Sequence, residues 1–265
     1  MNVRDPFSLP HGIKAIVFDL DGTIYYGDKV IDGANETIML ARTLGLQVFF
    51  ITNNSTKSRE EIYKRLKGMK IDCFLEEIYT SGYAAALYTK QSGLTDIYIS
   101  GSASLKKEFQ DMGIKLSSKE TAKTLVIGYN LDYSYESLTD DVEVALHSNV
   151  IVACNKERTY PGKDARLYPG CGAMVSAIEW CSSHRADIVI GKPDTYMLSH
   201  IMNVHSLEND EILMVGDTYE SDITMAVTMG IPSVYVGNEV HKDTICVKSI
   251  RVLYDILTGR LTHNE

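Results

Sequence analysis

The residues best able to do chemistry stand in one run, Asp19-Leu20-Asp21-Gly22-Thr23. The run follows an apolar stretch, residues 13–18, that is interrupted only by Lys14 and is typical of a buried strand. Both carboxylates therefore stand at the carboxyl end of that strand, the edge at which open α/β sheets bind ligands. Gly22 permits the chain to turn there. Two acids so close together suit acid–base or metal chemistry, although a short motif of this kind also occurs in plain polar turns.

Polar residues follow three further predicted strands, which are residues 46–51, 188–190 and 212–215. The first is followed by Thr52-Asn53-Asn54-Ser55 and the second by Gly191-Lys192-Pro193. The third is followed by Asp217 and Asp222. Taken singly, each run could be a helix cap or a solvated side chain. On one sheet edge, however, acids, a hydroxyl and a lysine would suit Mg²⁺ and a phosphate, because they offer hard oxygen ligands for the ion and donors for the anion.

Apolar runs alternate with amphipathic stretches through most of the chain. Helices are expected at residues 34–44, after a capping box at Ser58-Arg59-Glu60-Glu61, after Asp194, and at residues 219–229, with a last strand at 233–236. Strand and helix in alternation, with nearly continuous apolar strands, favour an α/β fold whose parallel sheet is covered by helices on both faces.

The middle of the chain carries its own set of alternating elements, at residues 97–100, 104–112, 125–127, 134–146, 150–153 and 172–182. No linker, internal repeat or low-complexity segment marks its edges. Periodicity alone does not separate two domains here.

Length and composition bound the function. The chain has 265 residues, 45% hydrophobic and 23% charged, which is typical of a globular protein with a sizeable core. Its net charge of −9 argues against nucleic acid as a partner, but a local site could still bind a small phosphorylated substrate. No apolar run is long enough to span a membrane, so no membrane partner is expected.

The cysteines and the first residues indicate a location. The five cysteines form no C-x-x-C pair, and residues 1–12 have no apolar core of a signal peptide. We therefore expect reduced thiols in a cytoplasmic protein.

The motifs in this order resemble those of the haloacid dehalogenase (HAD) superfamily. Asp-x-Asp-Gly-Thr-Ile-Tyr, Thr-Asn-Asn-Ser, a long insertion, Gly-Lys-Pro and Gly-Asp-x-x-x-x-Asp are similar to its type IIA branch with a C2-type cap. That branch includes NagD, p-nitrophenylphosphatases and phosphoglycolate phosphatases. The resemblance covers nearly the whole chain and implies a Rossmann-like core with an inserted α/β cap domain.

The resemblance also implies roles for the motif residues. Asp19 would be the nucleophile that forms an aspartyl phosphate, and Asp21 would protonate the leaving oxygen and later activate water. Mg²⁺ would be held by Asp19, the Asp21 backbone carbonyl and Asp217, with Asp222 acting on metal-bound water. The phosphoryl oxygens would be bound by Thr52, Asn53, Asn54 and Lys192.

The implied domains are a catalytic core of residues 1–92 and 187–265 and a cap of residues 93–186. A cap excludes water and contacts the leaving group. Tyr160, Arg166 and Tyr168 are the candidate specificity residues, although packing tyrosines and exposed arginines are common. The cap loop departs from the branch at Lys156-Glu157 and at Cys171, which affects the expected substrate and not the reaction.

The expected function is therefore Mg²⁺-dependent hydrolysis of a small phosphomonoester, such as a nucleotide or a sugar phosphate. A phosphotransferase or phosphomutase is one alternative, and a non-catalytic phospho-acceptor module is another. Which ester is used stays open, as does a homodimer, since some relatives dimerise through the cap.

Overall fold

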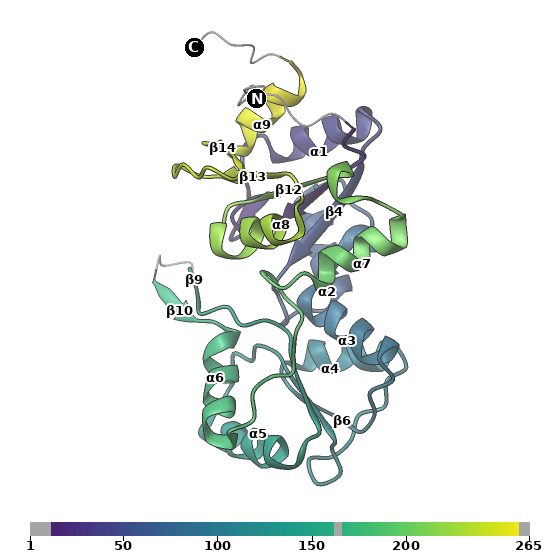
Figure 1. The fold of residues 1–265 in the computed structure, drawn as a ribbon, viewed down its shortest axis with the longest axis vertical. Helices are drawn as coiled ribbons and strands as arrows, with labels where there is room; N and C mark the ends of the chain where they lie inside the picture. Colours follow the sequence, from purple (N-terminus) through teal and green to yellow (C-terminus); the bar gives the residue numbers. More distant parts are fainter. Residues whose placement is uncertain (1–11, 162–165, 260–265) are drawn as a thin grey trace. The chain divides into compact units, whose positions relative to one another are not determined.

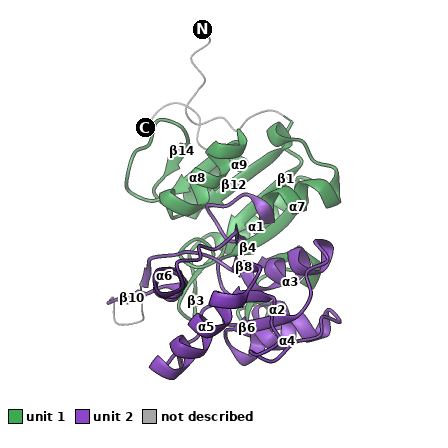
Figure 2. Cartoon of the chain, turned by 60° about the horizontal axis from the view of Figure 1, so that its bottom comes forward, with its two compact units in different colours: residues 1–52, 63–78, 198–265 green, residues 53–62, 79–197 purple. Residues whose placement is uncertain are grey.

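The computed structural model describes residues 12–161 and 166–259. The chain divides into two compact units, which Figure 2 colours separately. Unit 1 consists of residues 1–52, 63–78 and 198–265, and unit 2 of residues 53–62 and 79–197. Each unit contains a parallel sheet of its own, so each is described by itself.

Unit 1 is built on a six-stranded sheet in the order β14-β13-β12-β1-β4-β5. The strands are β14 (Ile245–Val247), β13 (Ser233–Val236), β12 (Ile212–Gly216), β1 (Ala15–Asp19), β4 (Gln47–Thr52) and β5 (Ile78–Thr80). Strand β1 lies between β12 and β4, parallel to both. All five of its residues are buried, which explains the unbroken apolar run that ends at Asp19.

Helices cover both faces of this sheet (Figure 1). Helix α1 (Ala34–Thr43) packs beside α9 (Ile250–Leu257), where the Thr37 hydroxyl donates to the Ile250 carbonyl. Helices α7 (Tyr196–His205) and α8 (Thr224–Met229) lie on the other face. The predicted α/β class, with a parallel sheet covered on both faces, is confirmed.

Unit 2 contains a four-stranded parallel sheet in the order β11-β8-β7-β6. The strands are β11 (Ile188–Val189), β8 (Val150–Ala153), β7 (Thr124–Ile127) and β6 (Ile97–Ser100). Side chains alternate between its faces: Val126 and Val152 pack toward α3 (Ser81–Gln91) and α4 (Ala103–Asp111). The intervening residues pack toward α5 (Tyr135–His147) and α6 (Cys171–Ser182).

Smaller elements complete the chain. They are the hairpin β2 (Tyr25–Tyr26)–β3 (Lys29–Val30), the antiparallel pair β9 (Thr159–Pro161)–β10 (Leu167–Pro169), helix α2 (Arg59–Gly68), the 3₁₀ turns η1 (Leu75–Glu77) and η2 (Asn209–Glu211), and the π-helical turn η3 (Tyr219–Ile223). Helix α2 begins with the predicted capping box: the Ser58 amide donates to Glu61 Oε2 at 2.7 Å, and the Glu61 amide donates to Ser58 Oγ at 3.2 Å.

Two predicted elements need correction. Of the strand predicted at 188–190, residues 188 and 189 form β11, which pairs with β8 in unit 2 and not with the six-stranded sheet. The helix predicted at 219–229 is two elements, because a π-helical turn over Tyr219–Ile223 precedes α8. Both corrections concern the polar runs at strand ends, and therefore the site.

The units also differ in extent from the predicted domains. Unit 2 includes residues 53–62, 79–92 and 187–197, which the prediction assigns to the core. The reason is packing: Ala84, Ala85 and Ala86 of α3 and Ile190 share one apolar cluster with α4 and the four-stranded sheet. That residues 93–186 act as a cap stays a prediction. Among the described residues, no helix combines the length and the apolarity needed to cross a membrane.

Candidate active site

Three acidic side chains come together in unit 1. One carboxylate oxygen each from Asp19, Asp217 and Asp222 lies within 4.8 Å of the others. Asp19 is the last residue of β1, and Asp217 directly follows the neighbouring strand β12. Asp19 is 6% exposed and Asp222 is 1% exposed. The prediction that these strand ends share one edge is confirmed for β1 and β12.

Gly22 makes this approach possible. Its φ of +96° is favourable only for glycine, and a Cβ at this position would lie 2.1 Å from Asp217 Oδ2. The next residue, Thr23, donates its hydroxyl to Asp217 Oδ1 at 3.4 Å. The turn after the first motif therefore sits directly against the acid of the last motif.

Asp222 reaches the cluster through the π-helical turn. Its amide donates to the Thr218 carbonyl at 2.9 Å, and the Thr218 amide donates back to Asp222 Oδ2 at 3.1 Å. Such wide turns are rare and often occur at functional sites. Since the hydrophobic pattern of residues 219–229 fits an ordinary helix equally well, the sequence could not reveal this turn.

Asp21 is not a member of the cluster. Its side chain is exposed, and its Oδ2 accepts a hydrogen bond of 3.0 Å from the Tyr25 hydroxyl. Arg65 in turn donates to Tyr25 Oη at 3.4 Å. Tyr25 belongs to the same motif but is not among the predicted site residues. Arg65 stands 40 residues further along, and no sequence signal points to it.

Thr52 stands at the same edge of the six-stranded sheet. It ends β4, in which Ile51 lies opposite Asp19 of β1, and it is 3% exposed. The next residues along the chain, Asn53 and Asn54, belong to unit 2. Asn54 Oδ1 accepts from the amides of Thr56 and Lys57 at 3.0 Å each, which shapes this turn.

Lys192 lies in unit 2, where it is 3% exposed and follows β11. The expectation that it follows a strand of the same sheet as Asp19 is wrong, because β11 belongs to the four-stranded sheet. Asn53 Nδ2 donates to the Lys192 carbonyl at 2.9 Å. Gly191 allows this contact, since a Cβ there would lie 2.5 Å from Asn53 Oδ1.

Asn53 is held on several sides. Its Nδ2 also donates to Glu157 Oε1 at 3.0 Å, and its carbonyl accepts from Asn155 Nδ2 at 2.7 Å and from Ser81 Oγ at 2.8 Å. An amide nitrogen has two hydrogens, and both are used. Any phosphate contact of Asn53 therefore falls to its backbone N–H. Glu157, which the sequence marks only as a departure from the branch, is thus one of the residues that hold the Asn53 side chain in place.

Two of the specificity candidates, Tyr160 and Tyr168, lie on β9 and β10, and the third, Arg166, directly precedes β10. Tyr160 and Tyr168 are directly opposite each other, with ring centroids 5.8 Å apart. Arg166 is exposed, and its guanidinium lies 5.6 Å from the centre of the Tyr168 ring. Tyr129 adds a third ring, its hydroxyl 3.1 Å from that of Tyr160. Their role in specificity stays a prediction.

The other cap-loop departures have structural partners. Lys156 forms an ion pair of 2.8 Å with Glu179 of α6. Cys171, the first residue of α6, is 2% exposed, and burial raises the pKa of its thiol to about 12. At neutral pH it is therefore a protonated packing residue.

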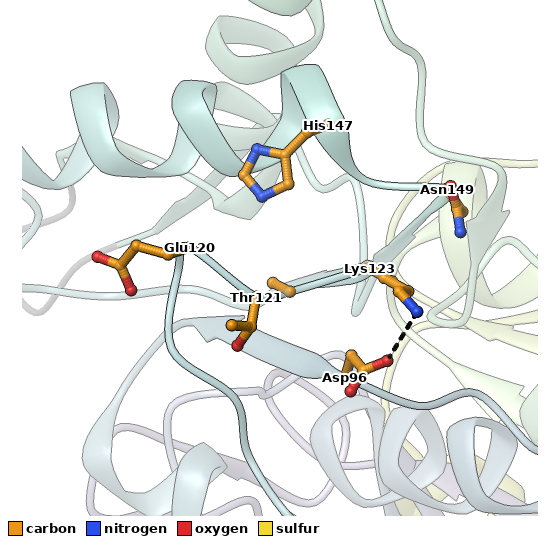
Figure 3. Close-up of a pocket in the computed structure, with 7 residues that line it drawn as sticks. Asp96, Glu120, Thr121, Lys123, His147 and Asn149 are labelled. Carbon is orange, nitrogen blue, oxygen red and sulfur yellow. Dashed lines mark ion pairs between the residues drawn. The ribbon is translucent and has the colours of Figure 1, made fainter.

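An open hollow in unit 2, of about 550 Å³, is a separate feature (Figure 3). Its lining includes Asp96, Lys123 and Asn149, the residues just before β6, β7 and β8. It therefore lies at the amino ends of these strands, whereas ligands of open α/β sheets bind at the carboxyl ends. None of the predicted site residues lines it, so we place the candidate site at the acidic cluster.

The donor set of that cluster suits a hard divalent cation. Carboxylates are the ligands that Mg²⁺ prefers, and the three oxygens lie close enough to share one ion. No sulfur or imidazole belongs to this cluster, which argues against a zinc site here.

Comparison with known proteins gives the class. Residues 16–115 match the family model described as "Haloacid dehalogenase-like hydrolase", and residues 189–256 match a second, HAD-hydrolase-like model. An acid sugar phosphatase of Staphylococcus aureus (strain USA300) is 32% identical over 224 residues, which is 84% of this chain and 86% of the relative.

Solved structures agree on the fold. A p-nitrophenyl phosphatase from Archaeoglobus fulgidus has a TM-score of 0.86 and 24% identity, covering 92% of this chain and 98% of its own. NagD from E. coli K-12 has a TM-score of 0.80 and 20% identity, covering 90% and 97%.

The chain belongs to the haloacid dehalogenase-like hydrolase family. Its fold is similar to those of NagD and a p-nitrophenyl phosphatase, as the motifs predict. The expected enzyme class, a phosphatase, is confirmed by the relative that is 32% identical.

Proposed function

We propose that this protein hydrolyses a small phosphomonoester in two displacements. Asp19 attacks phosphorus, the ester oxygen leaves, and an aspartyl phosphate forms; water then attacks this intermediate and releases phosphate. The observation that carries the proposal is the cluster of Asp19, Asp217 and Asp222 at the edge of β1 and β12, with Asp21 two residues beyond the nucleophile.

Asp21 is the proposed acid and base. Its side chain is exposed and stands outside the cluster of three carboxylates. It would protonate the leaving oxygen in the first displacement and take a proton from the attacking water in the second.

Mg²⁺ is the proposed cofactor. Asp19, the backbone carbonyl of Asp21 and Asp217 would hold it, and Asp222 would bind it through water. When bound, the ion offsets the repulsion between the nucleophile and an anionic substrate. Thr52, Asn53, Asn54 and Lys192 would bind the phosphoryl oxygens, with Asn53 acting through its backbone N–H.

The proposed substrate class is a small phosphorylated metabolite. Sugar phosphates are the first esters to test, because a relative that is 32% identical is named an acid sugar phosphatase. Residues 93–186 would form the cap, in which Tyr160, Arg166 and Tyr168 contact the leaving group.

Phosphate release from a panel of esters tests this function. The panel contains a sugar phosphate, a nucleoside monophosphate, phosphoglycolate and p-nitrophenyl phosphate, each assayed with Mg²⁺ and with EDTA. We expect release that requires Mg²⁺, with the highest kcat/KM identifying the substrate class. Transfer of phosphate to a second hydroxyl would instead indicate a mutase, and a phosphorylated protein without turnover would indicate an acceptor module.

A further inference from the structure

The Asp21 side chain is tied to a buried neighbour in its own unit. The Tyr25 hydroxyl donates to Asp21 Oδ2 at 3.0 Å, and Tyr25 is fully buried. The backbone holds the two residues at a fixed spacing, since the Gly22 amide donates to the Tyr25 carbonyl at 2.8 Å and the Tyr25 amide donates to the Leu20 carbonyl at 3.2 Å. The phenol is therefore a rigid anchor for an otherwise exposed carboxylate.

Arg65 fixes the phenol in turn. Its guanidinium carbon lies 4.3 Å from the centre of the Tyr25 ring, within the range of a cation–π contact. Nη1 donates to Tyr25 Oη at 3.4 Å, and Nη2 donates to the Gly27 carbonyl at 2.5 Å. One planar group thus joins α2 to both the ring and the turn of the β2–β3 hairpin.

The hydrogen bonds from Arg65 to Tyr25 and from Tyr25 to Asp21 can run in only one direction. A guanidinium has only donors, so the phenol oxygen must accept from Arg65. The single phenol hydrogen is then directed to Asp21 Oδ2. Donation from a cation also polarises the O–H group and strengthens its bond to the carboxylate.

From this geometry we infer that Tyr25 and Arg65 are positioning residues, which hold the Asp21 carboxylate in the one orientation that serves proton transfer. The inference rests on the proposed function, in which Asp21 is the acid and base. Because the carboxylate is already oriented, no entropy is lost in orienting it during the reaction. Orientation of reacting groups before the chemical step is a recognised source of rate enhancement.

Leaving-group dependence distinguishes this role from a merely structural one. The oxygen of a sugar phosphate needs a proton in order to leave, whereas p-nitrophenolate is stable without one. For Tyr25→Phe we expect kcat/KM for the sugar phosphate to fall by about ten- to hundredfold, and kcat/KM for p-nitrophenyl phosphate by less than about threefold. The quantity kcat/KM is used because it covers the steps through the first ester cleavage.

Three further variants make the test specific. Tyr26→Phe is the matched control, since its side chain is 52% exposed and stands next in the chain, and it should leave both rates unchanged. Arg65→Lys keeps the charge but not the two-pronged donor, and should shift the ratio of the two rates in the same direction. The double variant Tyr25→Phe/Arg65→Lys should shift that ratio no further than Tyr25→Phe, because Arg65 acts on Asp21 through the phenol.

These variants distinguish failure of the inference about Tyr25 from failure of the proposed function. An equal fall for both esters in Tyr25→Phe, or no fall in either, would overturn the inference. If Tyr25→Phe unfolds, as judged by its thermal transition, the ratio for Arg65→Lys decides in the same way. Asp21→Asn tests the underlying function: if it leaves sugar phosphate hydrolysis intact, the acid–base role of Asp21 fails, whatever Tyr25 does.

Discussion

The charges of Asp19, Asp217 and Asp222 define what unit 1 can bind. Three carboxylates whose oxygens lie within 4.8 Å repel one another, and two of them are buried from water. A cation bound by all three carboxylates would offset this repulsion. A divalent metal ion is the simplest group that satisfies all three.

Substitution of Asp217 tests the metal site. Asp217→Asn keeps the size of the side chain but removes one charge, so we expect the Mg²⁺ concentration for half-maximal activity to rise at least about tenfold. Asp210→Asn, an exposed acid seven positions earlier, is the control and should behave as the wild type. An unchanged Mg²⁺ requirement in Asp217→Asn would place the metal elsewhere.

Gly22 offers a second test with a close control. Gly22→Ala combines an unfavourable φ with a Cβ 2.1 Å from Asp217 Oδ2, whereas Gly45→Ala has a similar φ of +79° and nothing within 4 Å. Both variants should lose about 1 kcal/mol of stability from the backbone alone. Only Gly22→Ala should also lose activity, by about a hundredfold or more, since it displaces a metal ligand. Equal activity in the two variants would show that the close approach to Asp217 is unimportant.

At the scale of elements, α5 (Tyr135–His147) is joined to β6 by a buried acid. Asp141 is 2% exposed and accepts hydrogen bonds from Ser100 Oγ and, at 2.7 Å, from the Tyr133 hydroxyl. Burial raises its pKa above the ordinary 3.8, although the two donors and Lys106 act in the opposite direction. Asp140 next to it adds a smaller upward effect.

This pKa shift predicts a pH dependence of stability. Since the folded protein keeps the Asp141 proton at pH values where the unfolded chain has lost it, stability falls as pH rises from 3.8 to the folded pKa and is level above it. Asp141→Asn removes this contribution. The free energy of unfolding of the wild type minus that of the variant should therefore decline as the pH rises above about 3.8 and become level once the pH exceeds the folded pKa.

Chemical denaturation at several pH values measures this difference. Asp140→Asn, whose side chain is 35% exposed on the same helix, shows what loss of a neighbouring carboxylate does. A difference that rises with pH for Asp141→Asn would contradict the prediction.

The elements were predictable where a periodic pattern was strong. Strands β6, β8 and β13 begin and end at the predicted residues, and α1 differs from its prediction by one residue. Helix α3 was not predicted, because its Ala84-Ala85-Ala86 run is buried against a neighbouring helix and has no polar stripe to mark a face. Helix α9 was missed although it is amphipathic.

The sequence likewise predicted some features of the candidate site and not others. Asp19 and Asp217 could be predicted to meet because they stand at the carboxyl ends of β1 and β12, whereas Asp222 reaches them through a π-helical turn that the sequence does not reveal. The sheet that β11 joins could not be predicted, since a two-residue strand carries no information about its neighbour. The contacts of Asn53 with Glu157 and of Tyr25 with Arg65 join positions far apart in the chain, and only the folded structure reveals them.

At the scale of the whole molecule, each of the two units has its own sheet and its own polar groups. Unit 1 holds the three clustered carboxylates together with Asp21, and unit 2 holds Asn53 and Lys192. The proposal assigns the nucleophile and the metal ligands to the first set and phosphoryl contacts to the second. Substitutions in either set are therefore expected to lower the same activity.

Lys192 tests the contribution of unit 2. Lys192→Met keeps most of the buried side-chain volume and removes the charge, so we expect kcat/KM to fall by about a hundredfold or more for every ester. Lys107→Met, at an exposed ion pair with Asp111, is the control and should change kcat/KM little. An equal effect of the two would argue against a phosphoryl contact by Lys192.

The most direct test of the central claim is to find the phosphoryl group on the protein during turnover. The protein is mixed with substrate and Mg²⁺, quenched in acid within milliseconds, digested, and analysed by mass spectrometry. We expect one added phosphoryl group on Asp19, absent without Mg²⁺ and absent in Asp19→Asn, while Asp111→Asn on the surface of α4 should be labelled as the wild type. Phosphate on another residue, or sustained hydrolysis by Asp19→Asn, would contradict it.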